Sequence, residues 1–465
     1  MNRNDQRILS ARNRWNCKTS IVCVGALLFA AGLSFVLLSS TASVTASGAH
    51  GGADSHQWIG TWATAPQAAI PGHAQIFRNQ TLRLIVHVSA GGRKVRIKIS
   101  NTFGDQPLLI GGAHIARRTE AAEIDPASDR TLKFSGKAST TIPRHSLVES
   151  DPVELDVPAL GDLAISLFFP GTAAATTSHI LALQTNYVSG ETGDATAARK
   201  FPVARTIDSW PFLTGVDVAA SSQAAAIVAL GSSLTDGDGS SRDANRRWPD
   251  VLAERLAKDA GGNKELGVLN EGIIGNRLLS DFASPRQAGG PPPLGPVFAQ
   301  LGPALGQSGM VRFERDVLRE AGVSYLIVGL GVNDILFPGS FIPATESVNS
   351  QSILSGYRRL IARAHKQGIR VIGTTIPPFE HALFRSPFYD RFYTPEKERV
   401  RQEVNAWIHR SGEFDGVIDF DEAVRDPGHR TQLLPSYDSG DHLHVDDAGN
   451  IAQGNAIPLA LFEDR

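Results

Sequence analysis

The sequence contains very little cysteine. Its 465 residues include two cysteines, Cys17 and Cys23, and both lie close to the N-terminus. The body of the chain therefore has neither a disulfide framework nor a zinc site with cysteine ligands. The chain also lacks a surplus of positive charge, because 45 Lys and Arg stand against 47 Asp and Glu, a formal net charge of −2. This balance argues against a protein that binds nucleic acid through a broad basic surface.

Long apolar runs are equally scarce, and the one that approaches the length of a membrane span is Ile21–Leu38. Five basic residues precede it (Arg3, Arg7, Arg12, Arg14 and Lys18), and a stretch of small residues follows. Val44-Thr45-Ala46 fits a signal-peptidase site, so we predict a signal peptide over residues 1–46. The alternative is an uncleaved anchor, which would leave a membrane tether. Either form predicts an exported protein, periplasmic or extracellular.

Residues 57–215 have the texture of an all-β domain. Apolar residues recur at every second position along 82–88, with Arg83, Ile85 and His87 between them, and alternate with polar residues along 95–99; Ala90-Gly91-Gly92 separates the two runs. This pattern predicts a β-hairpin. Further short runs, with turn residues between them, cover 108–110, 131–134, 153–157 and 163–169. We therefore expect an N-terminal β-sandwich, jelly-roll-like, that serves as an accessory domain.

From residue 222 to residue 465 the pattern becomes α/β. Continuous apolar runs, typical of strands buried on both faces, cover 224–230, 266–269, 325–330, 371–375 and 417–420. Helical patterns lie between them, which predicts βαβ units and a parallel sheet with helices on both faces. Asp281–Met310 is rich in Pro and Gly, so we expect an irregular excursion without helix or central strand. Two roles are open for it: it borders the active site and screens bulky substrates, or it is a surface insertion that points away from the site.

Polar residues with catalytic chemistry follow the predicted strands. Active sites of open α/β sheets form at the carboxyl ends of the strands. There the sequence places Ser233, Gly275 and Asn333, and near the C-terminus it has Asp441 and His444. A serine becomes a nucleophile when a base takes its proton; a histidine can do so near neutral pH, and a carboxylate can orient that histidine. Backbone and side-chain N–H groups can stabilise the oxyanion that forms.

Four sequence blocks resemble those of the SGNH/GDSL hydrolases. Gly231-Ser232-Ser233-Leu234 is similar to their Gly-Asp-Ser-Leu block, and Gly275 to the glycine of their second block. Asn333, within Gly331-Val332-Asn333-Asp334, is similar to their third block, and Asp441-x-x-His444 to their last. The blocks occur in the family's order between Ala224 and Phe462. The resemblance implies a flavodoxin-like three-layer α/β/α domain and the activity of a serine ester hydrolase.

The same resemblance implies a role for each matching residue. Ser233 would be the nucleophile, and His444 would be the base, oriented by Asp441. The backbone N–H of Ser233, Gly275 and Asn333 would form the oxyanion hole. Ser232 stands where the family usually has Asp, and Val445 follows His444 where Pro is usual; neither difference removes a reacting group. We expect no cofactor and no metal.

The flanking sequence resembles a two-domain bacterial type of this family. The similar segments are Asn245–Pro249, Phe313–Asp316, Asp441–Gly449 and, less specifically, Trp58–Trp62 in an N-terminal β module. Metal alternatives are weaker. His442 and His444 would make half a metal site without an evident third ligand. Asp236-Gly237-Asp238-Gly239 hints at a calcium loop, but its twelfth position would be Arg247 instead of the required Glu.

We therefore predict an exported serine esterase that acts on acyl esters, such as acetyl esters of carbohydrates, or on other small esters. The expected partner is a small-molecule or glycan ester; we expect no nucleic acid and see no sign of an obligatory protein partner. A lipase or lysophospholipase is the alternative activity. A glycan-binding protein with an inactive hydrolase domain is the alternative from another class.

Overall fold

The computed structural model describes residues 57–259, 265–282, 301–383 and 389–463. Asp54–Arg465 belong to one compact unit. The predicted signal peptide, residues 1–46, lies outside the described residues. Within them, no helix is long and apolar enough to cross a membrane.

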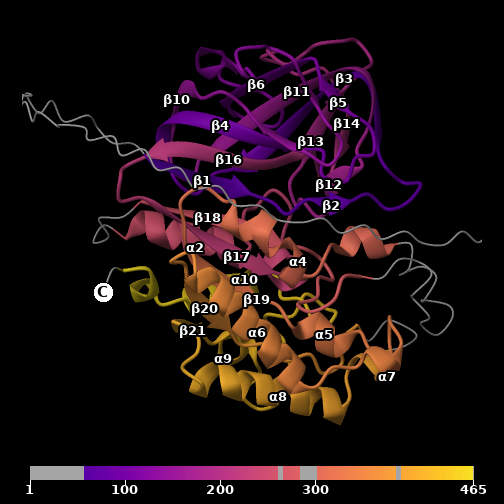
Figure 1. Ribbon diagram of the computed structural model, residues 1–465, viewed down its shortest axis with the longest axis vertical. Helices are drawn as coiled ribbons and strands as arrows, with labels where there is room; N and C mark the ends of the chain where they lie inside the picture. Colours follow the sequence, from indigo (N-terminus) through magenta and orange to yellow (C-terminus); the bar gives the residue numbers. More distant parts are fainter. Residues whose placement is uncertain (1–56, 260–264, 283–300, 384–388, 464–465) are drawn as a thin grey trace, which may run out of the picture. The chain divides into compact units, whose positions relative to one another are not determined.

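The N-terminal part is built mainly from two antiparallel sheets (Figure 1). The first contains β1 (Gln57–Ala63), β16 (Leu213–Ala220), β4 (Gly92–Ser100), β10 (Val153–Val157) and β9 (Leu147–Glu149). The second contains β14 (Val203–Ile207), β13 (Asn186–Ser189), β3 (Ile76–His87), β11 (Asp162–Ala174), β6 (Gly112–Arg117) and β7 (Arg130–Thr131). Side chains from both sheets share one buried apolar core, as in a β-sandwich.

Two smaller sheets complete this part. One joins β15 (Trp210–Pro211), β12 (Thr177–His179) and β2 (Gln67–Ala68). The other pairs β5 (Leu108–Ile110) with β8 (Thr140–Ile142). A 3₁₀ turn, η1, covers Pro126–Ser128.

The predicted β-hairpin across Ala90-Gly91-Gly92 is wrong. β3 pairs with β11 and β13, whereas β4 pairs with β16, β10 and β9, so the two strands belong to different sheets. The chain crosses from one sheet to the other at these glycines. A Cβ on Gly91 would lie 2.7 Å from the carbonyl oxygen of Val157. The glycine therefore permits a close backbone approach rather than a hairpin turn.

The C-terminal part has a five-stranded parallel sheet in the order β18-β17-β19-β20-β21 (Figure 1). The strands are β17 (Ala225–Gly231), β18 (Leu266–Gly272), β19 (Val323–Gly329), β20 (Arg370–Thr374) and β21 (Gly416–Ile418). In chain order this is 2-1-3-4-5, the flavodoxin-like arrangement that was expected. Neighbouring strands are in parallel register, with Val228 opposite Leu269 and Leu326.

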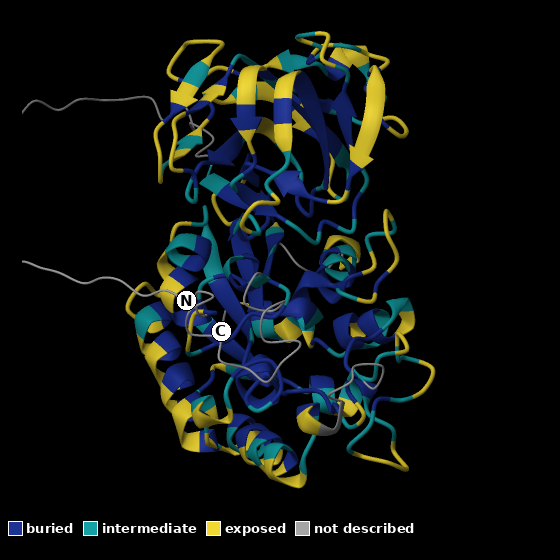
Figure 2. Cartoon of the chain, turned by 90° about the vertical axis from the view of Figure 1, so that its right-hand side faces the viewer, coloured by how far each residue is buried: buried dark blue, intermediate teal, exposed yellow. Residues whose placement is uncertain are grey.

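Helices cover both faces of this sheet. Alternate residues of β17 point to opposite faces, so Val228 packs with α6 (Ser350–His365) and α8 (Pro395–Arg410), whereas Ile227 packs with α2 (Trp248–Lys258). β17 is buried along its whole length, and the helices expose their outer sides (Figure 2). The helices are α1 (Ser233–Asp236), α2 (Trp248–Lys258), α4 (Gly309–Phe313), α5 (Val332–Leu336), α6 (Ser350–His365), α7 (Tyr389–Phe392), α8 (Pro395–Arg410), α9 (Phe420–Val424) and α10 (Asp447–Asn455). The result is the predicted three-layer α/β/α fold.

Shorter helical turns add to these helices: η2 (Gly302–Leu305), a π-helical turn η3 (Glu314–Leu318), η4 (Ala344–Glu346) and η5 (Leu459–Phe462). Much of the Pro- and Gly-rich excursion, residues 283–300, lies outside the described residues. Its last part contradicts the prediction of an irregular segment, because η2 forms there and α4 begins at Gly309. Both elements begin near Gly or Pro, which the first turn of a helix tolerates.

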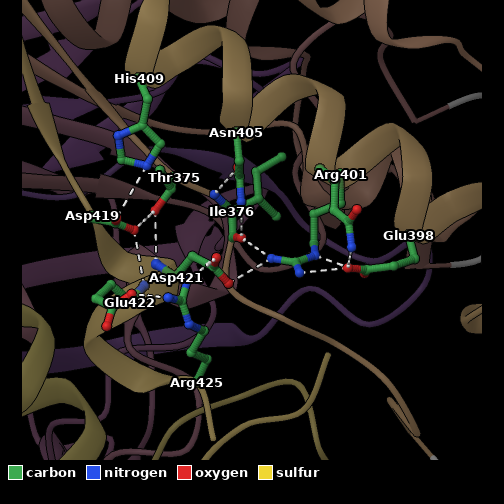
Figure 3. A network of polar contacts seen from close by, with 11 residues as sticks. Thr375, Ile376, Glu398, Arg401, Asn405, His409, Asp419, Asp421, Glu422 and Arg425 are labelled. Atoms are coloured by element: carbon green, nitrogen blue, oxygen red, sulfur yellow. Dashed lines mark hydrogen bonds and ion pairs between the residues drawn. The ribbon is translucent and has the colours of Figure 1, made fainter. Parts of the chain in front are cut away.

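A buried polar network fixes the carboxyl ends of β20 and β21 (Figure 3). The guanidinium of Arg401, on α8, donates to the carbonyl oxygen of Ile376 at 2.9 Å and to Asp421 at 2.7 Å. Its other contacts are with Glu398 one turn away. Thr375, which follows β20, donates to Asp419 at 2.9 Å. The loops after these strands are thus held by α8 and α9.

Candidate active site

Ser233 begins α1, directly after β17. Ser232 is the extended N-cap residue, and Ser233 itself is 4% exposed. The turn from strand to helix is tight, because a Cβ on Gly231 would lie 2.0 Å from Oγ1 of Thr235. Glycine at this position lets the helix start at once, which places the Ser233 side chain at the carboxyl end of the sheet.

His444 and Asp441 lie on the loop before α10 and face Ser233. Nε2 of His444 lies 2.9 Å from Oγ of Ser233, and Nδ1 lies 2.6 Å from Oδ2 of Asp441. The other oxygen of Asp441 accepts backbone N–H bonds from Leu443 and His444 at 3.0 and 2.8 Å. The loop therefore fixes the carboxylate, and the carboxylate fixes the imidazole. The structure brings these three predicted residues into one chain of contacts.

The electrostatics suit a histidine that accepts a proton. Burial would raise the pKa of Asp441, but the bond with His444, its charge and the two backbone N–H groups lower that pKa to about 2. An ionised Asp441 accepts a hydrogen bond from the N–H at Nδ1, so Nε2 is left as the acceptor toward Ser233. Burial lowers the pKa of the His444 imidazole, but Asp441, Asp238 and Asp438 outweigh it and raise the pKa above its usual value.

Gly275 lies in a turn that only glycine forms readily. Its φ is +71°, and a Cβ there would lie 2.8 Å from Cδ2 of Leu305. The turn closes with a bond from the N–H of Asn276 to the carbonyl of Ile273 at 3.1 Å. Asn276 also donates its side-chain amide to the carbonyl oxygens of Leu305 and Gln307. The segment around η2 thus holds the Gly275 turn in place through these two hydrogen bonds.

Asn333, on α5, contacts this turn. Its Nδ2 donates to the carbonyl oxygen of Asn276 at 2.9 Å, and its side chain is buried. An amide nitrogen carries two hydrogens, so this bond fixes the orientation of the group and uses one of them. The next residue, Asp334, accepts the N–H groups of Leu278 and Leu279 at 2.7 and 3.0 Å. The Gly275 and Asn333 segments therefore form one hydrogen-bonded assembly.

Several supporting residues were not found from the sequence. Asp236 accepts from the N–H of Ile274 at 3.0 Å. Arg312 is buried and donates to the carbonyl of Gly231 at 2.9 Å and to Oδ1 of Asn276 at 3.0 Å. Asp238 lies 3.6 Å from Nε2 of His444. Arg312 directly precedes the Phe313–Asp316 segment noted above, which was the signal available for it.

His442 lies apart from the Ser233 chain of contacts. Its Nδ1 contacts the carboxylate of Asp438, and its ring centroid is 6.0 Å from that of His381. Among the residues that the structure describes, no group of three or more His, Cys, Asp or Glu is placed to hold a metal ion.

The C-terminal half of the chain is similar to a known protein family and to several solved structures. Residues 227–457 match the family described as GDSL-like lipase/acylhydrolase. No curated protein matches the sequence significantly. Similar solved structures include a native aryl esterase of M. smegmatis, with 19% identity over 50% of this chain and 95% of the other, at a TM-score of 0.35. Another is a carbohydrate acetylesterase family member of Sinorhizobium meliloti, with 18% identity over 50% and 94%, at a TM-score of 0.36.

The family match spans the parallel sheet, the Ser233 turn, the Gly275 and Asn333 segments and the loop that carries Asp441 and His444. Residues 227–457 are thus a domain of the GDSL-like lipase/acylhydrolase family, and the protein is a carboxylic ester hydrolase.

Proposed function

We propose that the protein hydrolyses small acyl esters through an acyl-enzyme intermediate on Ser233. The observation that carries this proposal is the line of contacts from Asp441 through His444 to Ser233, at 2.6 and 2.9 Å. A serine activated in this way is the arrangement that acyl transfer requires.

The reaction follows from this arrangement. Oγ of Ser233 attacks the carbonyl carbon of the ester while Nε2 of His444 takes the hydroxyl proton. The tetrahedral intermediate collapses, the C–O bond to the alcohol breaks, and His444 returns the proton to the leaving alcohol. A water molecule then attacks the acyl-serine with His444 again as the base, which releases the acid and restores Ser233. Asp441 stays ionised and stabilises the imidazolium in both steps.

Three donors are candidates for the oxyanion hole. They are the backbone N–H groups of Ser233 and Gly275 and the side-chain amide of Asn333. The Gly275 turn and the Asn333 amide are joined through the carbonyl of Asn276, so their positions are fixed before substrate binds. Preorganised donors stabilise developing charge without a cost in reorganisation.

The burial of the reacting groups supports a small acyl group. Ser233 is 4% exposed and His444 is 8% exposed, so the acyl carbon has to enter a confined space to reach Oγ. An acetyl ester fits this requirement better than a long fatty acyl chain. We propose acetyl esters of carbohydrates as the substrate class. The predicted signal peptide supports export, and an exported acetylesterase would meet extracellular glycans.

A serine-reactive probe and an ester panel test this proposal. Wild type and Ser233→Ala are assayed on a short-chain chromogenic ester, acetylated glycans and a lysophospholipid, and both are treated with a fluorophosphonate. We expect labelling at Ser233 alone, and loss of activity in a variant that folds normally, as judged by circular dichroism. Activity that survives in Ser233→Ala contradicts the mechanism. Preference for the lysophospholipid over acetylated glycans contradicts the substrate class and favours the lysophospholipase alternative.

A further inference from the structure

We propose that the β-sandwich part supplies a positioning residue, His179, to the active site; this inference rests on the esterase mechanism proposed above. His179 ends β12, which lies between β15 and β2 in the small three-stranded sheet. Its side chain is 2% exposed. The residue belongs to no sequence block of the hydrolase domain and precedes the family match by about 50 positions.

Both ring nitrogens of His179 have partners. Nδ1 lies 3.0 Å from the carbonyl oxygen of Ala65, and Nε2 lies 2.9 Å from Oδ1 of Asp236. A carbonyl and a carboxylate both accept, so each contact is a hydrogen bond when the ring nitrogen that faces it carries a hydrogen. A hydrogen bond to the carboxylate of Asp236 is charge-assisted, which makes it stronger than a neutral one. The ring of Trp210 lies beside the imidazole, with centroids 5.9 Å apart.

Asp236 connects His179 to the segments that hold Ser233 and Gly275. It is the last residue of α1, whose first residue is Ser233. While Oδ1 contacts His179, Oδ2 accepts the N–H of Ile274 at 3.0 Å, and Ile274 directly precedes Gly275. One carboxylate thus joins the nucleophile turn, the proposed oxyanion turn and the β-sandwich part. Its orientation depends on both partners, because each holds one of its oxygens.

The same small sheet makes a second connection to the Gly275 turn, through η2. The amide of Gln67, on β2, donates to the carbonyl oxygen of Ala304 in η2. The next residue, Leu305, packs against Gly275, and its carbonyl accepts the amide of Asn276 at 3.0 Å. The N–H of Ile180 in turn donates to Gln67 at 2.9 Å, which links the two contacts within the sheet. The Gly275 turn is therefore supported from two directions by residues of the β-sandwich part.

This arrangement predicts a specific kinetic defect. An oxyanion donor acts on the transition state, and a displacement of about 1 Å can cost about 10²-fold in rate. Without His179, Asp236 loses one of its two fixed partners, and the turn through Gly275 gains freedom. We expect kcat to fall by about 10- to 100-fold while KM changes little, because ground-state binding does not use this donor.

The experiment compares four full-length variants on one chromogenic ester. His179→Leu removes both ring contacts, and His179→Gln keeps a donor toward Asp236. His114→Leu is the control, because His114 is a partly buried histidine of the same β-sandwich part that also contacts a carboxylate, with Nδ1 3.0 Å from both oxygens of Asp129. Its contacts stay within the β-sandwich part. Asp236→Asn keeps an oxygen for Ile274 but removes the charge that faces His179.

The expected result is a lower kcat for His179→Leu, partial recovery in His179→Gln, and an unchanged kcat for His114→Leu. If His179→Leu does not fold, a double-mutant cycle with His179→Gln and Asp236→Asn decides. If the two residues are coupled, the kcat of the double variant is only slightly lower than that of the more impaired single variant. Losses that simply add, a rise in KM alone, or a kcat for His179→Leu equal to that of His114→Leu would overturn the proposal. Ser233→Ala in the same assay tests the mechanism separately, because its activity does not depend on the role of His179.

Discussion

The carboxylate of Asp238 lies 3.6 Å from Nε2 of His444, the same ring nitrogen that contacts Ser233. The imidazole thus has one carboxylate on each side, Asp441 at Nδ1 and Asp238 near Nε2. Both raise the pKa of His444 against the effect of burial, and Asp438 adds to them. The geometry therefore sets the pH at which the base is free to act.

We predict that Asp238→Asn moves the acidic limb of the kcat/KM profile to lower pH. His444 must be neutral to take the serine proton, so activity falls as pH drops below its pKa. Removal of a negative charge near the ring lowers that pKa, because the imidazolium loses a stabilising neighbour. The profile is measured between about pH 5 and pH 9, a range centred near the ordinary pKa of histidine. The exposed Asp259, at the end of α2, provides the control variant Asp259→Asn, which should leave the limb in place. A limb that moves to higher pH in Asp238→Asn, or not at all, would show that Asp238 does not tune this base.

Asn333→Ala should lower kcat by about 10²–10³-fold and leave KM nearly unchanged. The buried amide is oriented by its bond to the carbonyl of Asn276, and we assign its remaining hydrogen to the oxyanion. Steady-state kinetics on a short-chain ester measure both parameters. An increase in KM at constant kcat would instead make Asn333 a residue that binds the ground state of the substrate.

The proposed catalytic residues were accessible from sequence because each lies in a short local block. Ser233, Gly275 and Asn333 follow buried strands, and parallel strands end at one edge of a sheet, so their proximity followed from the fold class. His179 and Asp238 could not be found in this way. His179 contacts Asp236, which is 57 positions away, and Asp238 contacts His444, on a loop near the C-terminus. The Asp236–Gly239 segment even suggested a calcium loop, although Asp236 serves a buried histidine.

For the fold, too, features set by the local sequence pattern were predicted, and a feature set by contacts distant in sequence was not. The five strands of the parallel sheet were predicted, since continuous apolar runs and intervening helical patterns define βαβ units. Their flavodoxin-like order was implied by the family resemblance. The error at Gly91 arose because alternation reports that a strand is half-buried and says nothing about its partner. In a sandwich, consecutive strands can lie in opposite sheets, and β3 and β4 do so. The distinction depends on contacts such as that between Gly91 and Val157, which are distant in sequence.

Ser232→Ala should leave activity and stability unchanged or stabilise the protein by about 1 kcal/mol. Within the described residues the hydroxyl of Ser232 is buried and has no hydrogen-bond partner. Its removal therefore relieves the free-energy cost of burying an unpaired polar group. Ser89→Ala is the matched comparison, since that buried hydroxyl donates to the carbonyl of Thr61 and accepts the N–H of Val268. Urea unfolding should show a loss of about 1–3 kcal/mol for Ser89→Ala. A similar loss for Ser232→Ala would mean that its hydroxyl does have a structural partner.

Arg312→Met should destabilise the protein by about 3–5 kcal/mol, the usual effect of removing one member of a buried ion pair. The Arg312 side chain is fully buried and lies 3.1 Å from the carboxylate of Asp316. It also donates hydrogen bonds to two acceptors beside the site, the carbonyl oxygen of Gly231 and the side-chain oxygen of Asn276. Burial and the charges of its acidic neighbours raise the pKa of the nearby Glu271 well above its usual value, and Arg312 opposes that rise.

A control for this prediction lies on the same segment. Arg319 is 73% exposed and 3.9 Å from Glu314, so Arg319→Met should change the free energy of unfolding by at most about 1 kcal/mol. Urea titrations followed by circular dichroism give both values. Equal effects of the two substitutions would contradict the structural role of Arg312. A folded Arg312→Met should also have a lower kcat, because the strand end before Ser233 and the turn after Gly275 both lose the donor that joins them.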